Sequence, residues 1–243
     1  LLIFRFNNEM RKLPSMIYLS YVAITDTLSL FVWNLNNYLE PNHGTRITLY
    51  NILSCRISLF VQYVSLESSA LLLSILCVDR FFSIVPIKCW LTTKIPFNSV
   101  KSATYWSIST IGLVSLINIH LLIFLGVYEK PFENKANHSF SNHTIFRCYK
   151  SSIFQPLYDY WDLIHLIIYN LIPFLIMCIF NILLIKQTLY GNSFANSNNL
   201  SLKRTKSLKK RKQLTFSLLA VTFLFLLMTL PNSIYFGLMA TNN

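Results

Sequence analysis

Long apolar segments recur along this chain of 243 residues. Five of them are long enough to cross a bilayer as a helix, which takes about 20 apolar residues: 16–39, 53–85, 100–128, 161–189 and 213–240. Charged residues make up only 12% of the chain, against about 25% in an ordinary soluble domain. The sequence therefore predicts an all-α membrane protein with five complete spans.

The segments between the spans differ in Lys and Arg content, and this difference predicts their sides of the membrane. The loop at residues 190–212 is the most basic, with "LKRTKSLKK" in its second half, so we expect it inside the cell and close to anionic lipid. The basic segments before residue 16 and after residue 85 also face inside. The other two connecting segments are then extracellular.

The extracellular assignment agrees with two further features of the sequence. Asn137 and Asn142 each begin an N-glycosylation triplet in the segment after residue 128. Cys55, at the outer start of the second span, and Cys148 lie on the same oxidising side, where a disulfide persists. We predict that these two cysteines are bonded.

Asp79 and Arg80 form an acid-base pair near the end of the second span. At 1.5 Å per residue, a helix from Cys55 to Asp79 is about 36 Å long and crosses the hydrocarbon core. The pair therefore lies at the cytoplasmic mouth. From these two residues alone, a charged flank of a membrane helix at the interface is the preferred explanation.

Several motifs in a fixed order give a more specific indication. They are Asp26 in "YVAITD", Cys55, "DRF" at residues 79–81, Trp106, Cys148, Pro173 in "NLIPFLIMCIFN" and Pro231 in "FLFLLMTLP". In this set the chain resembles the rhodopsin-like G-protein-coupled receptors, from the end of helix one to helix six. The resemblance implies a multi-pass plasma-membrane protein with a seven-transmembrane bundle, of which we expect most of helix one and all of helix seven to be missing here.

The resemblance also implies roles for individual residues. Asp79, Arg80 and Phe81, with Phe in place of the usual Tyr, correspond to the motif that restrains the resting receptor and engages a heterotrimeric G protein. Asp26 and Ser69 correspond to a sodium or water pocket. No other cofactor is expected.

The chain departs from the family pattern at two positions and keeps an aromatic residue of that pattern at a third. Thr229 stands where a Trp usually precedes the helix-six proline, Pro231, by two residues, although Phe225 retains an aromatic side chain one turn earlier. Asn181 replaces the usual inner Tyr of helix five. These departures leave open a non-signalling receptor relative or a truncated gene product.

The outer halves of the first two complete spans hold the candidate ligand contacts Trp33, Gln62 and Tyr63. Each is equally well explained by packing between helices. In amine receptors of this family an Asp occupies the position of Gln62, so its absence favours a peptide ligand, such as a neuropeptide. Glu67, a further acid within the span, has no partner that the sequence identifies.

Other functional classes are disfavoured by the same sequence. A transporter or channel is expected to show internal repeats or Gly-interrupted helices, but there are only 5 Gly and no repeat is evident. The chain has no paired-His or Cys-His spacing that predicts an enzyme or a metal site. The basic run adjoins a membrane span, which argues against a nucleic-acid partner.

Overall fold

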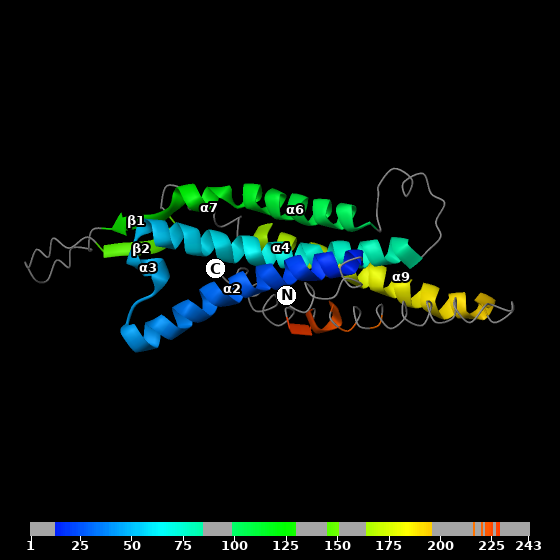
Figure 1. Ribbon diagram of the computed structural model, residues 1–243. Coiled ribbons are helices and arrows are strands. Elements are labelled where there is room, and N and C mark those ends of the chain that lie inside the picture. Colours follow the sequence, from blue (N-terminus) through cyan, green and yellow to red (C-terminus); the bar gives the residue numbers. More distant parts are fainter. Residues whose placement is uncertain are drawn as a thin grey trace, which may run out of the picture. The chain divides into compact units, whose positions relative to one another are not determined.

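The computed structural model describes residues 13–84, 99–129, 145–150 and 164–195, with isolated helical positions between 216 and 228. The elements, shown in Figure 1, are α2 (Pro14–His43), α3 (Ile47–Tyr50), α4 (Ile52–Ile84), α6 (Val100–Ile117), α7 (Ile119–Phe124), β1 (Leu125–Glu129), β2 (Ile145–Lys150), the π-helical turn η3 (Ile167–Leu171) and α9 (Ile172–Ala195). The described part of the chain is thus mostly helical, as predicted.

Four helices in the described residues are long and apolar enough to span a membrane: Pro14–His43, Ile52–Ser83, Val100–Phe124 and Ile164–Lys186. Each overlaps one of the predicted spans. Most of the fifth predicted span, 213–240, lies outside the described residues, but its described positions are helical. An all-α membrane bundle follows, because in lipid only helices and closed barrels satisfy all their backbone hydrogen bonds.

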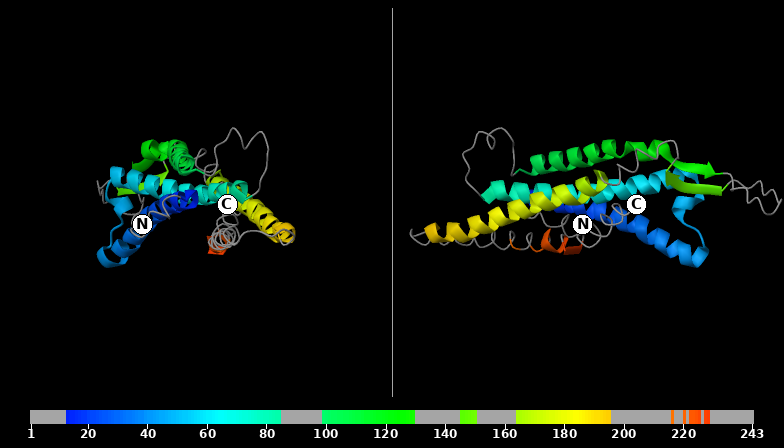
Figure 2. Two further views of the ribbon diagram at one scale, coloured as in Figure 1. Left: turned by 45° about the vertical axis from the view of Figure 1, so that its right-hand side comes forward. Right: turned by 180° about the vertical axis from the view of Figure 1, so that it is seen from behind.

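The third span ends earlier than its apolar sequence predicts. We expected helix to Tyr128, but α7 ends at Phe124, and Leu125–Glu129 forms β1, paired antiparallel with β2. The two strands lie side by side in both views of Figure 2. The chain is already extended at Leu125, with φ of −85° and ψ of 151°, and the next residue, Gly126, has a left-handed φ of 85° at the irregularity of the register between Leu125 and Val127.

A proline explains the π-helical turn at the start of the helix-five segment. Pro173 has no N–H to donate to the carbonyl group four residues earlier, so a regular α-helical hydrogen bond is lost at this point. The chain adopts the wider turn η3 immediately before it. The carbonyl oxygen of Pro173 accepts a contact of 3.4 Å from Ser74 Oγ of α4, which joins α9 to α4.

The chain divides into two compact units, each described here by itself. The Arg80 unit comprises Leu1–Ala23, Ser69–Thr110 and Leu163–Asn243, and the disulfide unit comprises Ile24–Ser68 and Ile111–Asp162. Helices α2, α4 and α6 contribute residues to both units.

The core of the disulfide unit forms around Cys55, Leu121 and Leu125, all at most 5% exposed. Cys55 and Cys148 form a disulfide with a Cα–Cα distance of 5.6 Å, and this bond ties β2 to the start of α4. Arg56 Nε also donates a 2.8 Å hydrogen bond to the carbonyl oxygen of Leu125. A covalent bond and a charge-assisted hydrogen bond therefore hold the hairpin against α4.

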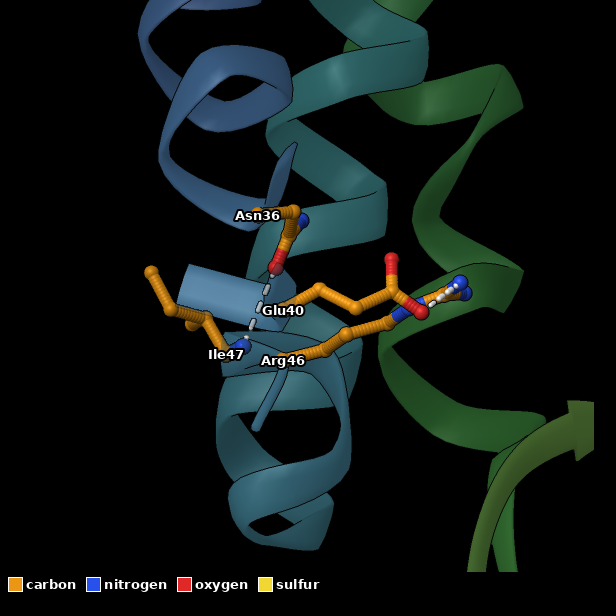
Figure 3. Close-up of polar contacts among 4 residues, drawn as sticks. All are labelled: Asn36, Glu40, Arg46 and Ile47. Atoms are coloured by element: carbon orange, nitrogen blue, oxygen red, sulfur yellow. Dashed lines mark hydrogen bonds and ion pairs between the residues drawn. The ribbon is translucent and has the colours of Figure 1, made fainter. Parts of the chain in front are cut away.

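A short turn connects α2 to α3, and its polar contacts are drawn in Figure 3. Asn36 Oδ1 accepts a 3.0 Å hydrogen bond from the backbone N–H of Ile47, the first residue of α3. Arg46 donates to Glu40, and this hydrogen bond raises the pKa of the exposed guanidinium above its ordinary value. The Asn36 contact satisfies a backbone donor that a helix start otherwise leaves without a partner.

Candidate functional site

The inner end of α4 carries the acid-base pair identified in the sequence. Arg80 Nη2 donates a 2.6 Å hydrogen bond to Asp79 Oδ2. The Asp79 side chain is 1% exposed and that of Arg80 is 14% exposed. Because both groups have left water, their mutual attraction is screened much less than that of a surface pair, and removing either partner leaves an uncompensated buried charge.

Aromatic side chains surround the next turn of the site. Phe81 contacts Phe82 edge-on, with ring centroids 5.5 Å apart, and meets Phe180 of α9 in the same manner at 5.4 Å. Edge-to-face contacts of this kind need no hydroxyl group. The Phe at position 81, where the family usually has Tyr, therefore fits a packing role that joins α4 to α9.

A second polar contact in the Arg80 unit was not predicted from the sequence. Asn181 Nδ2 of α9 donates a 2.8 Å hydrogen bond to Oγ1 of Thr222, whose residue is 1% exposed. The sequence drew attention to Asn181 only as a departure from the family pattern. Its partner lies 41 residues away, so no local signal identified Thr222.

The predicted switch residues are only partly described. Phe225 is helical and half-buried, and Thr229 and Pro231 lie outside the described residues. The switch therefore stays a prediction. The described helical positions 222–225 include Phe225 and also Thr222, the residue that the Asn181 contact joins to α9.

The predicted ion or water pocket involves residues of different units. Asp26 lies on α2 in the disulfide unit with an exposed side chain, whereas Ser69 lies on α4 in the Arg80 unit and is 3% exposed. The sodium or water site remains a prediction. Within the described residues, no group of three or more His, Cys, Asp and Glu side chains is placed to hold a metal ion.

The candidate ligand residues all lie in the disulfide unit. Tyr63 packs against the cluster around Cys55, and Gln62 beside it is half-buried. Trp33 of α2 is 56% exposed. Packing accounts for the position of Tyr63, while a ligand contact for any of the three stays a prediction.

Glu67 of α4 is the buried acid whose partner the sequence did not reveal. Asn118 Nδ2, between α6 and α7, donates a 2.6 Å hydrogen bond to Glu67 Oε2, and both side chains are 0% exposed. The same amide nitrogen donates to the carbonyl oxygen of Val114 at 3.0 Å. This contact holds α4 against the end of α6 inside the disulfide unit.

The predicted glycosylation sites, Asn137 and Asn142, lie outside the described residues, as does most of the basic loop at 190–212. The remaining observations concern the described spans, their disulfide and the pair at the inner end of α4. All of these features lie in the stretch of sequence that a single family profile covers. The whole chain, residues 1–243, matches the profile of the family described as "7 transmembrane receptor (rhodopsin family)".

Proposed function

Because the chain belongs to the rhodopsin family of seven-transmembrane receptors, which are multi-pass plasma-membrane proteins, we propose that it binds an extracellular peptide and activates a heterotrimeric G protein. Arg80 is the residue through which we expect the receptor to engage that G protein. The two units then have different functions. The disulfide unit receives the ligand, and the Arg80 unit transmits the signal.

The Asp79–Arg80 pair is the observation that carries the signalling part of this proposal. A guanidinium held at 2.6 Å by a carboxylate that is 1% exposed is neutralised within the protein and only partly available to a partner. A second conformation in which Arg80 leaves Asp79 would present the planar donor to acceptor groups of a partner. Ligand binding then acts by shifting the population between the two conformations.

Two features of the disulfide unit support a peptide as the ligand. Gln62, near the outer end of α4, is neutral and so supplies no counter-ion for a small protonated amine. The antiparallel pair β1 and β2, held to α4 by the Cys55–Cys148 bond, offers backbone N–H and C=O groups along its edges. Extended peptides commonly bind such edges through main-chain hydrogen bonds.

Substituting Lys for Arg80 tests the signalling role. Lys keeps the charge and also reaches the membrane interface, but it lacks the planar, multidentate donor group of Arg. In cells expressing the complete coding sequence, we expect Arg80→Lys to lower G-protein activation by about tenfold at unchanged surface expression, the effect of losing one charge-assisted hydrogen bond. Arg46→Lys, at an exposed position in the disulfide unit, is the matched control and should leave activation unchanged.

Asp79→Asn supplies the opposite perturbation. It removes the counter-charge that holds Arg80, so basal activation should rise above that of the parent receptor. If Arg80→Lys couples normally and Asp79→Asn leaves basal activity unchanged, Arg80 is only an interfacial anchor. A non-signalling relative, the alternative left open by Thr229 and Asn181, would instead show no G-protein activation in the parent receptor.

A further inference from the structure

Arg56, the residue after the disulfide-bonded Cys55, uses only part of its hydrogen-bonding capacity inside the disulfide unit. Its Nε donates a 2.8 Å hydrogen bond to the carbonyl oxygen of Leu125, and the residue is half-buried. A guanidinium carries five N–H donors, of which this contact uses one. The N–H groups of Nη1 and Nη2 form no hydrogen bond to any residue that the structure describes.

No Asp or Glu side chain that the structure describes in this unit forms an ion pair with Arg56. Glu40 pairs with Arg46 at the turn between α2 and α3. Glu67 lies about 16 Å further along α4 and accepts from an amide there. Glu129 belongs to the opposite end of β1, about 13 Å along the strand from Leu125. The charge of Arg56 is therefore not compensated among the described side chains.

The guanidinium of Arg56 lies at the open end of the hairpin formed by β1 and β2. Leu125, which accepts from Arg56, is the first residue of β1 and pairs with Lys150, the last residue of β2. A second basic residue thus belongs to the same end of the hairpin. The bond from Cys55 to Cys148 fixes both elements here, and disulfides persist on the oxidising, extracellular side. A ligand arriving from outside meets this end of the unit.

We propose that the Nη1 and Nη2 groups of Arg56 bind a carboxylate of the peptide ligand, either an Asp or Glu side chain or the C-terminal carboxylate. Two parallel N–H donors on a planar group match the two oxygens of a carboxylate. The hydrogen bond from Nε to Leu125 orients the guanidinium before the ligand arrives, which lowers the entropic cost of binding. This inference rests on the proposed function, because it names the chemical class of the peptide that the disulfide unit receives.

The test measures binding of synthetic peptides to the purified receptor, expressed from the complete coding sequence. The probes are short random-sequence peptides in three pools: one with C-terminal acids and no Asp or Glu, one with C-terminal amides that includes Asp and Glu, and one with amides and neither acid. Retained peptides are identified by mass spectrometry. The parent should retain peptides with a carboxylate at one fixed position about tenfold or more over their carboxamide counterparts, the effect of one hydrogen bond between charged groups. The first two pools distinguish the C-terminal source from the side-chain source.

Substitutions at Arg56 should change this preference in graded steps. Arg56→Gln should abolish it, and Arg56→Glu should reverse it in favour of Lys or Arg at the same peptide position. Arg56→Lys keeps the charge but not the paired donors, so it should retain a weaker preference, and it keeps the test decisive if the other variants do not fold. Arg46→Gln is the matched control: it removes the same charge, but one that Glu40 already compensates, and should leave the preference unchanged.

A merely structural role for Arg56 gives a different result. If the contact with Leu125 only holds the hairpin, Arg56→Lys and Arg56→Gln should lower the retention of all peptides alike and leave the ratio of acid to carboxamide unchanged, which would overturn the proposal. An equal loss of preference in Arg46→Gln would also overturn it, because the effect would then come from net charge alone.

Failure of this site and failure of the proposed function are distinguishable. If the parent retains peptides but does not prefer acidic ones, only the carboxylate site is wrong. If the parent retains no peptide from any pool, peptide recognition fails and the site fails with it. Signalling through Arg80 does not enter this measurement, so it is tested separately by the activation assay.

Discussion

The hydrogen bond between Asn118 and Glu67 should be one of the larger single contributions to the stability of the disulfide unit. The donor and acceptor are 2.6 Å apart, and both side chains are 0% exposed. Replacing Asn118 by Val removes the donor and keeps a similar apolar volume. Glu67 then loses a hydrogen bond without gaining water in exchange.

The expected magnitude follows from this burial. Hydrogen bonds between membrane helices are worth on average about 0.6 kcal/mol and at most about 1.7 kcal/mol in double-mutant cycles. A short bond to a carboxyl group with no solvent access belongs near the upper end of that range. We therefore expect a coupling energy to Glu67 of about 1–1.7 kcal/mol. Asn118→Val itself should destabilise by about 1–3 kcal/mol, because it also leaves a buried acceptor without this donor.

The assay is a double-mutant cycle read by thermal unfolding of the purified receptor in detergent. Asn118→Val and Glu67→Leu should each lower the free energy of unfolding, and the double variant should be more stable than the sum of the two losses predicts. Ser115→Ala is the control: Ser115 Oγ donates only within its own helix, to the carbonyl oxygen of Ile111 at 2.8 Å. It should change the free energy of unfolding little.

Two outcomes would refute the reasoning about this pair. One is additivity of the two substitutions within about 0.5 kcal/mol, which is the behaviour of independent sites. The other is an effect of Ser115→Ala as large as that of Asn118→Val. It would show that removing any polar side chain near the end of α6 destabilises the protein, whether or not that side chain contacts Glu67.

Three further predictions concern the disulfide unit. Asn36→Ala removes the side-chain acceptor of the Ile47 N–H and should cost about 1 kcal/mol in thermal unfolding, while Asn36→Asp should retain most of the stability; equal losses would contradict a capping role. Gly126→Ala should cost about 1–3 kcal/mol, because φ is 85° and the new Cβ would lie 2.8 Å from Cγ1 of Ile52, whereas an unchanged midpoint would show that the hairpin adapts freely. Cys148→Ser removes the disulfide between residues 93 apart in sequence, which on chain-entropy grounds should lower the free energy of unfolding by at most about 5 kcal/mol. The thermal unfolding midpoint of this variant should no longer respond to reductant. A reductant response that persisted in Cys148→Ser would mean that another disulfide stabilises the protein.

The sequence alone determined the helical, membrane-spanning character of the chain. A bilayer requires each spanning segment to be long, apolar and hydrogen-bonded within itself, and all of these requirements are local. The positions of Cys55 and Cys148 on one side of the membrane followed from the alternation of spans, and the structure joins them. The adjacent residues Asp79 and Arg80 were likewise recognisable, because neighbours in sequence at the end of a helix need no tertiary contact to meet.

The partners across helices were decided only by the tertiary structure. In a membrane, lipid-facing and bundle-facing positions are both apolar, so hydrophobic periodicity does not reveal which face of a helix meets a neighbour. Asn118 meets Glu67 across 51 residues of sequence and Asn181 meets Thr222 across 41, distances over which no local pattern acts. The end of α7 at Phe124 was hidden for a related reason: residues 125–128 continue an apolar run, and only their pairing with β2 makes them a strand.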